Sequence, residues 1–114
     1  MVGSYPANPI FRTAPEAFYR DLIAFAKKYE IIILHDNAYS DIIYDGRRGG
    51  SFLEYEGAKE VGIEFYSLSK SFNYTGARLS FAVGNRAVIQ EFKALRTHFD
   101  YGIFLPVQYK DRHP

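Results

Sequence analysis

The sequence predicts a small α/β protein with a mixed, mostly parallel sheet of three strands and helices on its flanks. Three short apolar runs, rich in Ile, Val, Phe and Leu, are typical of buried strands. Two longer stretches repeat apolar residues at helical spacing. Glycines and prolines between these segments indicate turns. The apolar runs are residues 31–34, 63–68 and 79–83, and the helical stretches end near residues 29 and 98.

The first helix is predicted to follow Thr13. This residue can cap the helix, with Pro15 in the first turn and Glu16 three positions after the cap, a spacing typical of a capping box. Apolar residues then recur at helical spacing and give the helix one apolar face. These residues are Phe18, Leu22, Phe25 and Tyr29.

The apolar runs are predicted as strands. Residues 31–34 read Ile-Ile-Ile-Leu without polar alternation, which favours a strand buried on both faces. A short helix is expected at 57–61, before the second strand at 63–68. An amphipathic helix at 86–98 is expected after the third strand at 79–83.

Connection lengths predict the directions of the strands. The chain between Asp36 and Ile63 is long enough for a crossover, so the first two strands can be parallel. Only ten residues, 69–78, separate the second strand from the third. Because a parallel crossover usually needs about a dozen residues or more, the third strand is predicted to run antiparallel to the second.

Composition narrows the classes of function. The chain has 114 residues, of which 47% are hydrophobic, and this suits one globular domain. A formal net charge of +1 gives no basic surplus for nucleic acid. No apolar stretch approaches the roughly 20 residues of a membrane span, and the N-terminus lacks signal-peptide features. Cysteine is absent and the three histidines are scattered, so no metal site is predicted. A cytoplasmic protein without nucleic-acid or membrane partners is expected.

Chemically reactive side chains cluster after the second predicted strand. Residues 67–78 read Ser-Leu-Ser-Lys-Ser-Phe-Asn-Tyr-Thr-Gly-Ala-Arg, so that Arg78 lies eight positions after Lys70. Lys70 can form an imine with an aldehyde. Ser67, Ser69 and Arg78 can hold a phosphate through charge-assisted hydrogen bonds. The pattern indicates a site for a phosphorylated aldehyde.

A second cluster, residues 35–39, follows the first predicted strand. Ligands of open α/β sheets bind outside the carboxyl ends of parallel strands, so Asp36 and Lys70 are expected to face one crevice. Pyridoxal 5'-phosphate acts as an electron sink when a carboxylate keeps its ring nitrogen protonated. Asp36 can be that carboxylate, and Tyr39 can donate its phenol to the ring oxygen. A lone Asp after a strand is more often a turn residue or helix cap, but Tyr39 three positions on and the second matching cluster favour the cofactor role for Asp36.

Over roughly residues 5 to 109, the chain resembles the class I/II aminotransferases among the fold-type I pyridoxal phosphate enzymes. The resemblance rests on Asp36 and Tyr39 in a D-x-x-Y element and on the S-x-S-K element that ends at Lys70. It extends to the G-x-R element that ends at Arg78 and to Asn8, which stands where the family has an N-P-T-G asparagine. The sequences of residues 35–39 and 99–102 are most similar to those of the diaminopimelate and aspartate aminotransferase branch.

This resemblance implies a fold and an activity. The fold is part of the large domain of the pyridoxal phosphate-dependent transferases, and the partners are an amino acid and a 2-oxo acid, with a homodimer as the family's assembly. The implied catalytic residue is Lys70, which would hold the cofactor and move the substrate's α-proton. The cofactor-binding residues it implies are Asn8, Asp36, Tyr39, Ser67, Ser69, Lys70 and Arg78.

The chain also departs from the family. Ile10-Phe11 stands where the family has Thr-Gly, and the residues after Tyr109 are polar where the family continues into an apolar helix. Family members are several times longer. The chain, 1–114, is therefore expected to be one partial domain with a divergent polar tail at 110–114, and to show weak or absent transaminase activity alone. Two alternatives remain open, an inert remnant and a carbon–sulfur lyase of the same fold.

Overall fold

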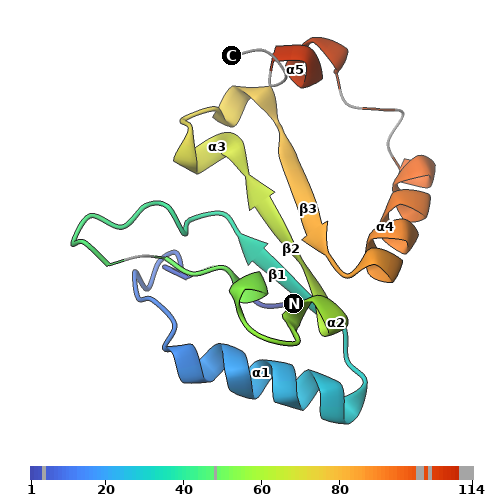
Figure 1. Cartoon of the computed structure of the whole chain (residues 1–114). Helices are drawn as coiled ribbons and strands as arrows, with labels where there is room; N and C mark the ends of the chain where they lie inside the picture. Colours follow the sequence, from blue (N-terminus) through green and yellow to red (C-terminus); the bar gives the residue numbers. More distant parts are fainter. Residues whose placement is uncertain (4, 48, 100–101, 103, 111–114) are drawn as a thin grey trace.

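The fold is a three-layered α/β arrangement in which two helices lie on opposite faces of a three-stranded sheet (Figure 1). The structure is a computed structural model, and it describes the chain apart from residues 4, 48, 100–101, 103 and 111–114. The strands follow the order β1-β2-β3 and comprise β1 (Ile33–Asn37), β2 (Gly62–Ser67) and β3 (Ser80–Gly84). The helices are α1 (Glu16–Tyr29), α2 (Ala58–Val61), α3 (Leu68–Ser71), α4 (Arg86–Phe99) and α5 (Leu105–Lys110), with short 3-10 turns η1 (Phe52–Glu54) and η2 (Thr75–Ala77).

The strand directions agree with those predicted from connection lengths. β1 and β2 are parallel, with Asp36 opposite Phe65. β2 and β3 are antiparallel, with Phe65 opposite Ala82. The predicted mixed sheet is confirmed, and so are the helices expected at 57–61 and 86–98.

The start of α1 differs from the prediction. The residue before the first helical turn is Pro15, whose backbone is extended (φ −68°, ψ 152°) and whose side chain makes no capping hydrogen bond. Because proline disfavours helical backbone at the residue before it, Ala14 cannot extend the helix backwards. Thr13 therefore lies outside the helix, and the predicted capping box is wrong.

β1 lies further along the chain than predicted. Glu30 adopts a left-handed conformation (φ 54°) that ends α1, and the amide of Ile31 donates to the Ala26 carbonyl at 3.0 Å. Since Ile31 closes the helix, the strand begins only at Ile33. Ile31 and Ile32 are 44% and 57% exposed, and burial alternates along β1, so the expectation of a strand buried on both faces is wrong.

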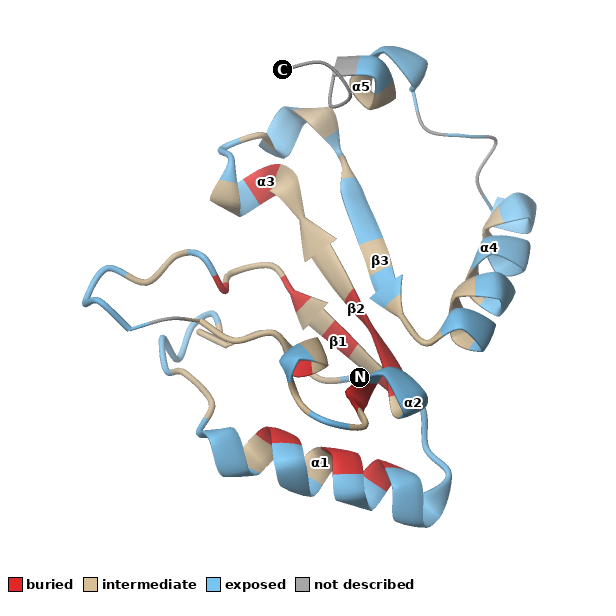
Figure 2. Cartoon of the chain, viewed as in Figure 1, coloured by how far each residue is buried: buried red, intermediate tan, exposed pale blue. Residues whose placement is uncertain are grey.

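The core lies between α1 and the sheet. Figure 2 shows buried residues on the inner side of α1 and on β1 and β2, whereas β3 and α4 are largely exposed. Tyr19 of α1 contacts the His35 ring edge-on and stacks on Tyr55. Phe92 of α4 contacts Phe65 on the opposite face of the sheet. The core cluster comprises Tyr19, Ile23, Ala26, Ile33, Phe52 and Ala58.

Burial of Tyr19 predicts a loss of stability in alkaline solution. The side chain is 2% exposed, and burial, followed by the charges of Tyr55, Glu64 and Tyr5, raises the pKa of Tyr19 to about 12. The folded state therefore favours the neutral phenol. This stabilisation is complete below the unfolded pKa of about 10 and is lost as pH rises to about 12; a shift of about two units corresponds to roughly 2–3 kcal/mol.

Urea unfolding at a series of pH values measures this effect. Between pH 8 and 12 the wild type is expected to lose roughly 2–3 kcal/mol more than Tyr19→Phe, which has no phenol to ionise. Equal losses in the two proteins would contradict the assignment.

α5 is a helix that the sequence pattern did not predict. The predicted polar tail, 110–114, begins at the last residue of α5, and residues 111–114 lie outside the described chain. Among the described residues, no helix is both long and apolar enough to cross a membrane.

Candidate functional site

The candidate site lies at the sheet edge where the two parallel strands end. β1 and β2 point the same way, so the loop after β1 and helix α3 after β2 leave the sheet at one edge (Figure 1). Asp36 occupies the last but one position of β1. Side chains alternate along a strand, so Asp36 lies on the same face as its partner Phe65 and opposite to His35 and Asn37.

Lys70 lies just past the end of β2, in the single turn of α3. This turn forms because the Ser67 hydroxyl, at its N-cap, accepts a hydrogen bond from the Ser69 amide at 3.2 Å. Ser69 is buried, whereas Lys70 is exposed. The local fold thus anchors the two serines and leaves the lysine amine accessible.

Tyr39 and Lys70 are brought together from separate loops. The Lys70 Nζ atom lies 5.8 Å from the centroid of the Tyr39 ring, within the range of a cation–π contact. Among the described residues, neither the Lys70 amine nor the Asp36 carboxylate has a hydrogen-bond or ion-pair partner. Both groups are thus available to a ligand.

Arg78 closes the turn that follows α3. Its backbone is left-handed (φ 54°), and one guanidinium nitrogen donates to the Thr75 carbonyl at 3.2 Å. The Thr75 hydroxyl donates in turn to the Ser69 carbonyl at 3.1 Å. These bonds link η2 to α3, and the exposed guanidinium keeps further N–H groups for an anion.

Asn8 lies in the N-terminal segment, beyond the outer edge of β1. Val2 pairs with this edge: its amide donates to the Leu34 carbonyl at 2.8 Å, and its carbonyl accepts from the Asp36 amide at 2.9 Å. Asn8 is exposed. In the described chain no hydrogen bond joins it to Asp36 or Lys70.

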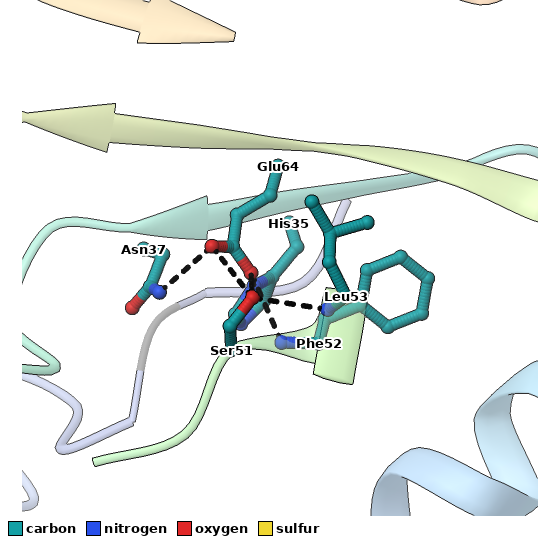
Figure 3. Close-up of polar contacts among 6 residues, drawn as sticks. All are labelled: His35, Asn37, Ser51, Phe52, Leu53 and Glu64. Carbon is teal, nitrogen blue, oxygen red and sulfur yellow. Dashed lines mark hydrogen bonds and ion pairs between the residues drawn. The ribbon is translucent and has the colours of Figure 1, made fainter. Parts of the chain in front are cut away.

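A buried polar network lies on the other face of the same strands. The Glu64 carboxylate receives hydrogen bonds from Asn37 Nδ2 (3.0 Å) and the Phe52 amide (3.0 Å), and from the Ser51 hydroxyl (2.9 and 3.0 Å) (Figure 3). His35 Nδ1 lies 2.9 Å from it. A carboxylate can only accept, so this ring nitrogen carries the proton in that contact.

Glu64 is ionised in this network despite being only 4% exposed. Burial raises the pKa of the Glu64 carboxyl, but the hydrogen bonds from His35, Asn37 and Ser51 outweigh burial and hold the pKa below its usual value. The remaining polar atoms, His35 Nε2 and Asn37 Oδ1, are buried without a partner in the described chain. Glu64 therefore accepts the hydrogen bonds that fix His35 and Asn37, the two residues that flank Asp36 in the sequence of β1.

The sequence pattern did not reveal this network. Glu64 lies inside the apolar run 63–68, and a charged residue inside such a run is itself a signal of a buried, partnered carboxylate. The two polar residues that flank Asp36 in β1 give a matching signal. Only the register, in which His35 lies opposite Glu64, joins the two.

Comparisons with known proteins show the family to which the chain belongs. Residues 1–108 match the family model described as aminotransferase class I and II. The LL-diaminopimelate aminotransferase of Halothermothrix orenii is 55% identical over 106 residues, which are 93% of this chain and 27% of that protein. The glutamate-pyruvate aminotransferase AlaC of Escherichia coli is 38% identical over 95% of this chain and 26% of its own length.

Solved structures share the fold. Substrate-bound BacF from Bacillus subtilis superposes with a TM-score of 0.85 at 44% identity, over 94% of this chain and 27% of that one. A probable N-succinyldiaminopimelate aminotransferase from Thermus thermophilus gives a TM-score of 0.86 at 33% identity, over 93% of this chain and 28% of its own. The chain belongs to the class I and II aminotransferase family, and it spans about a quarter of the length of these relatives.

Proposed function

We propose that the chain forms the cofactor-holding part of a pyridoxal 5'-phosphate-dependent aminotransferase, which passes the amino group of an amino acid to a 2-oxo acid. The observation that carries this proposal is the Lys70 amine lying 5.8 Å from the Tyr39 ring centroid, at the sheet edge where Asp36 occupies the last but one position of β1. Family membership supports it independently.

The side chains at this edge fit the chemistry of the cofactor. The exposed Lys70 amine suits an aldehyde, and the free Asp36 carboxylate suits a protonated ring nitrogen. The Tyr39 phenol can donate a hydrogen bond to the ring oxygen. Ser67, Ser69 and the guanidinium of Arg78 belong to one hydrogen-bonded turn and offer donors to a phosphate. Asn8, which forms no hydrogen bond with these residues in the described chain, remains a proposed contact on the strength of the resemblance alone.

Each residue then has a defined task. Pyridoxal 5'-phosphate, when bound, would supply the electron withdrawal that makes the proton on the substrate's α-carbon removable. Lys70 Nζ takes this proton and returns it, which requires a neutral amine at the first step. Asp36 keeps a proton on the ring nitrogen, and Tyr39 donates to the ring oxygen. Ser67, Ser69 and Arg78 bind the phosphate and so fix the orientation of the ring.

The partners we propose follow from the relatives. Amino acids and 2-oxo acids are the proposed substrates, with a dicarboxylic or diamino acid favoured because relatives carry names such as LL-diaminopimelate aminotransferase. A homodimer in the cytoplasm is the proposed setting. Because the chain spans about a quarter of these relatives, we expect it to bind the cofactor but to transaminate weakly or not at all alone.

Titration with the cofactor tests the proposal. Pyridoxal 5'-phosphate is expected to give a visible absorption band, and pyridoxal, which lacks the phosphate, to bind at least about tenfold more weakly. Each charge-assisted hydrogen bond to a phosphate is worth about 1.5–3 kcal/mol, and tenfold is about 1.4 kcal/mol. Equal affinity for the two aldehydes would overturn the proposal, because any exposed lysine can react with both. Absence of the visible band would overturn it as well.

A further inference from the structure

Three side chains form a second polar cluster beside the candidate site. The Tyr66 hydroxyl donates to Asp41 Oδ2 and lies 2.8 Å from the Ser71 hydroxyl. The Ser71 hydroxyl donates to the same Asp41 oxygen at 2.7 Å. The three oxygens thus form a closed triangle in which a single carboxylate oxygen accepts from two hydroxyls.

The members of this triangle come from three segments of the fold. Asp41 lies in the loop after β1, Tyr66 is the last but one residue of β2, and Ser71 is the last residue of α3. The Tyr66 ring packs on Phe81 of β3, with centroids 5.1 Å apart, so the sheet fixes its position. Tyr66 is therefore held by the sheet, and its hydroxyl contacts both Asp41 and Ser71.

The phenol of Tyr66 stays a donor over the neutral range. Burial raises the pKa of Tyr66, and the hydrogen bond to Asp41 raises it further, whereas the Ser71 contact lowers it. A protonated phenol and an ionised carboxylate form a charge-assisted hydrogen bond, which is stronger than a bond between neutral groups.

The tied residues are the immediate neighbours of two proposed cofactor contacts. Asp41 is two residues after Tyr39, and Ser71 directly follows Lys70. We propose that Asp41, Tyr66 and Ser71 are positioning residues that hold the Tyr39 loop against α3 and so set the contact between the Tyr39 ring and the Lys70 amine. The contact itself is a property of the cofactor-free chain; its use in catalysis rests on the proposed function.

The alternative is that the triangle only stabilises the fold. That role would leave the environment of Lys70 unchanged in any variant that still folds. The positioning role requires instead that loss of the triangle changes Lys70 through Tyr39 and through no other route. A double-mutant cycle between Tyr66 and Tyr39 separates the two roles.

The experiment measures acetylation of the cofactor-free chain by acetic anhydride, with mass spectrometry of each lysine. Lys93, exposed on α4, is the internal reference. A cation–π contact at an exposed site is worth about 0.5–1 kcal/mol, so Tyr39→Leu is expected to raise the Lys70 rate about two- to fivefold relative to Lys93. Tyr66→Phe is expected to raise it to a similar extent, and the double variant no further.

Variants of Ser71 provide a rescue. Ser71→Ala is expected to behave like Tyr66→Phe, and Ser71→Thr, which keeps the hydroxyl, like the wild type. Circular dichroism establishes that each variant folds. An unchanged Lys70 rate in folded Tyr66→Phe, or effects of Tyr66→Phe and Tyr39→Leu that multiply fully, would overturn the positioning role.

A second arm separates this inference from the proposed function. Affinity for pyridoxal 5'-phosphate is expected to fall two- to fivefold in Tyr66→Phe. If the variants change the Lys70 acetylation rate as expected but the wild type binds no pyridoxal 5'-phosphate, the positioning role stands and the proposed function fails. If the wild type binds the cofactor but the variants leave the Lys70 rate unchanged, the proposed function stands and the positioning role fails.

Discussion

Replacing Glu64 with alanine is expected to unfold the protein or to lower its free energy of unfolding by at least about 3 kcal/mol, because each buried donor left without a partner costs about 1–3 kcal/mol. Four groups donate to this carboxylate, from His35, Asn37, Ser51 and the Phe52 amide. Without it, each buried donor loses its partner and the free energy of desolvation is not recovered. Small domains have a total stability of about 5–15 kcal/mol, so this loss is a large part of it.

Glu60→Ala is the matched control. Glu60 also forms an ion pair, with Lys27 at 2.7 Å, but its side chain is 69% exposed. Exposed pairs contribute about 0–1 kcal/mol, because water solvates both partners when they separate. Urea unfolding followed by circular dichroism compares the two variants. Similar losses in both would contradict the structural role given to the Glu64 network.

The pH dependence of stability gives a second readout on Glu64. Its pKa in the folded protein lies below the ordinary value, so the folded state favours the carboxylate. The resulting stabilisation is present above the unfolded pKa and is lost as pH falls through the folded pKa. Glu64→Gln cannot ionise, so it is expected to lose less stability than the wild type as the solution is acidified. A parallel decline in both proteins would argue against an ionised Glu64.

Replacing Lys70 with alanine is expected to abolish covalent attachment of pyridoxal 5'-phosphate. The amine is exposed, lies 5.8 Å from the Tyr39 ring centroid and pairs with no carboxylate in the described chain, so it is free to react. Reduction with borohydride fixes the attached cofactor, and peptide mass analysis locates it. The label is expected on the peptide that contains residue 70 in the wild type and to be absent from this variant, together with the visible band.

Lys93→Ala serves as the control for Lys70. Lys93 is an exposed lysine on α4, away from the strand-end loops, and its removal is expected to leave both band and label unchanged. A label distributed over several lysines in the wild type would contradict a specific site at Lys70. Retention of the band in Lys70→Ala would do the same.

The sequence allowed the fold class to be predicted, because its signals are local. Repeats of Phe and Leu at helical spacing indicate α1 and α4, and the ten-residue connection 69–78 indicates an antiparallel β3. Element ends were less predictable. The extended backbone of Pro15 makes α1 begin at Glu16, later than predicted. The left-handed backbone of Glu30 ends α1, and β1 begins only at Ile33.

The candidate residues were likewise visible in the sequence as two short motifs, which the structure places at the end of β1 and directly after β2. The structure places Tyr39 beside Lys70 and holds Ser67, Ser69 and Arg78 in one turn. The catalytic and binding roles of these residues remain predictions. Asn8 matches the family pattern by resemblance alone; it is exposed, and in the described chain no hydrogen bond joins it to Lys70.

The amino-acid sequence alone thus determined α1, α2 and α4, the strand directions and the identity of the reactive side chains, since each depends on residues near one another along the chain. Tertiary structure decided what surrounds those side chains. Glu64 meets His35 across 29 positions, and Asp41 meets Ser71 across 30. Such contacts exist only once the parallel register of β1 and β2 is formed, because pairing of whole strands, not spacing along one segment, brings these groups within hydrogen-bond distance.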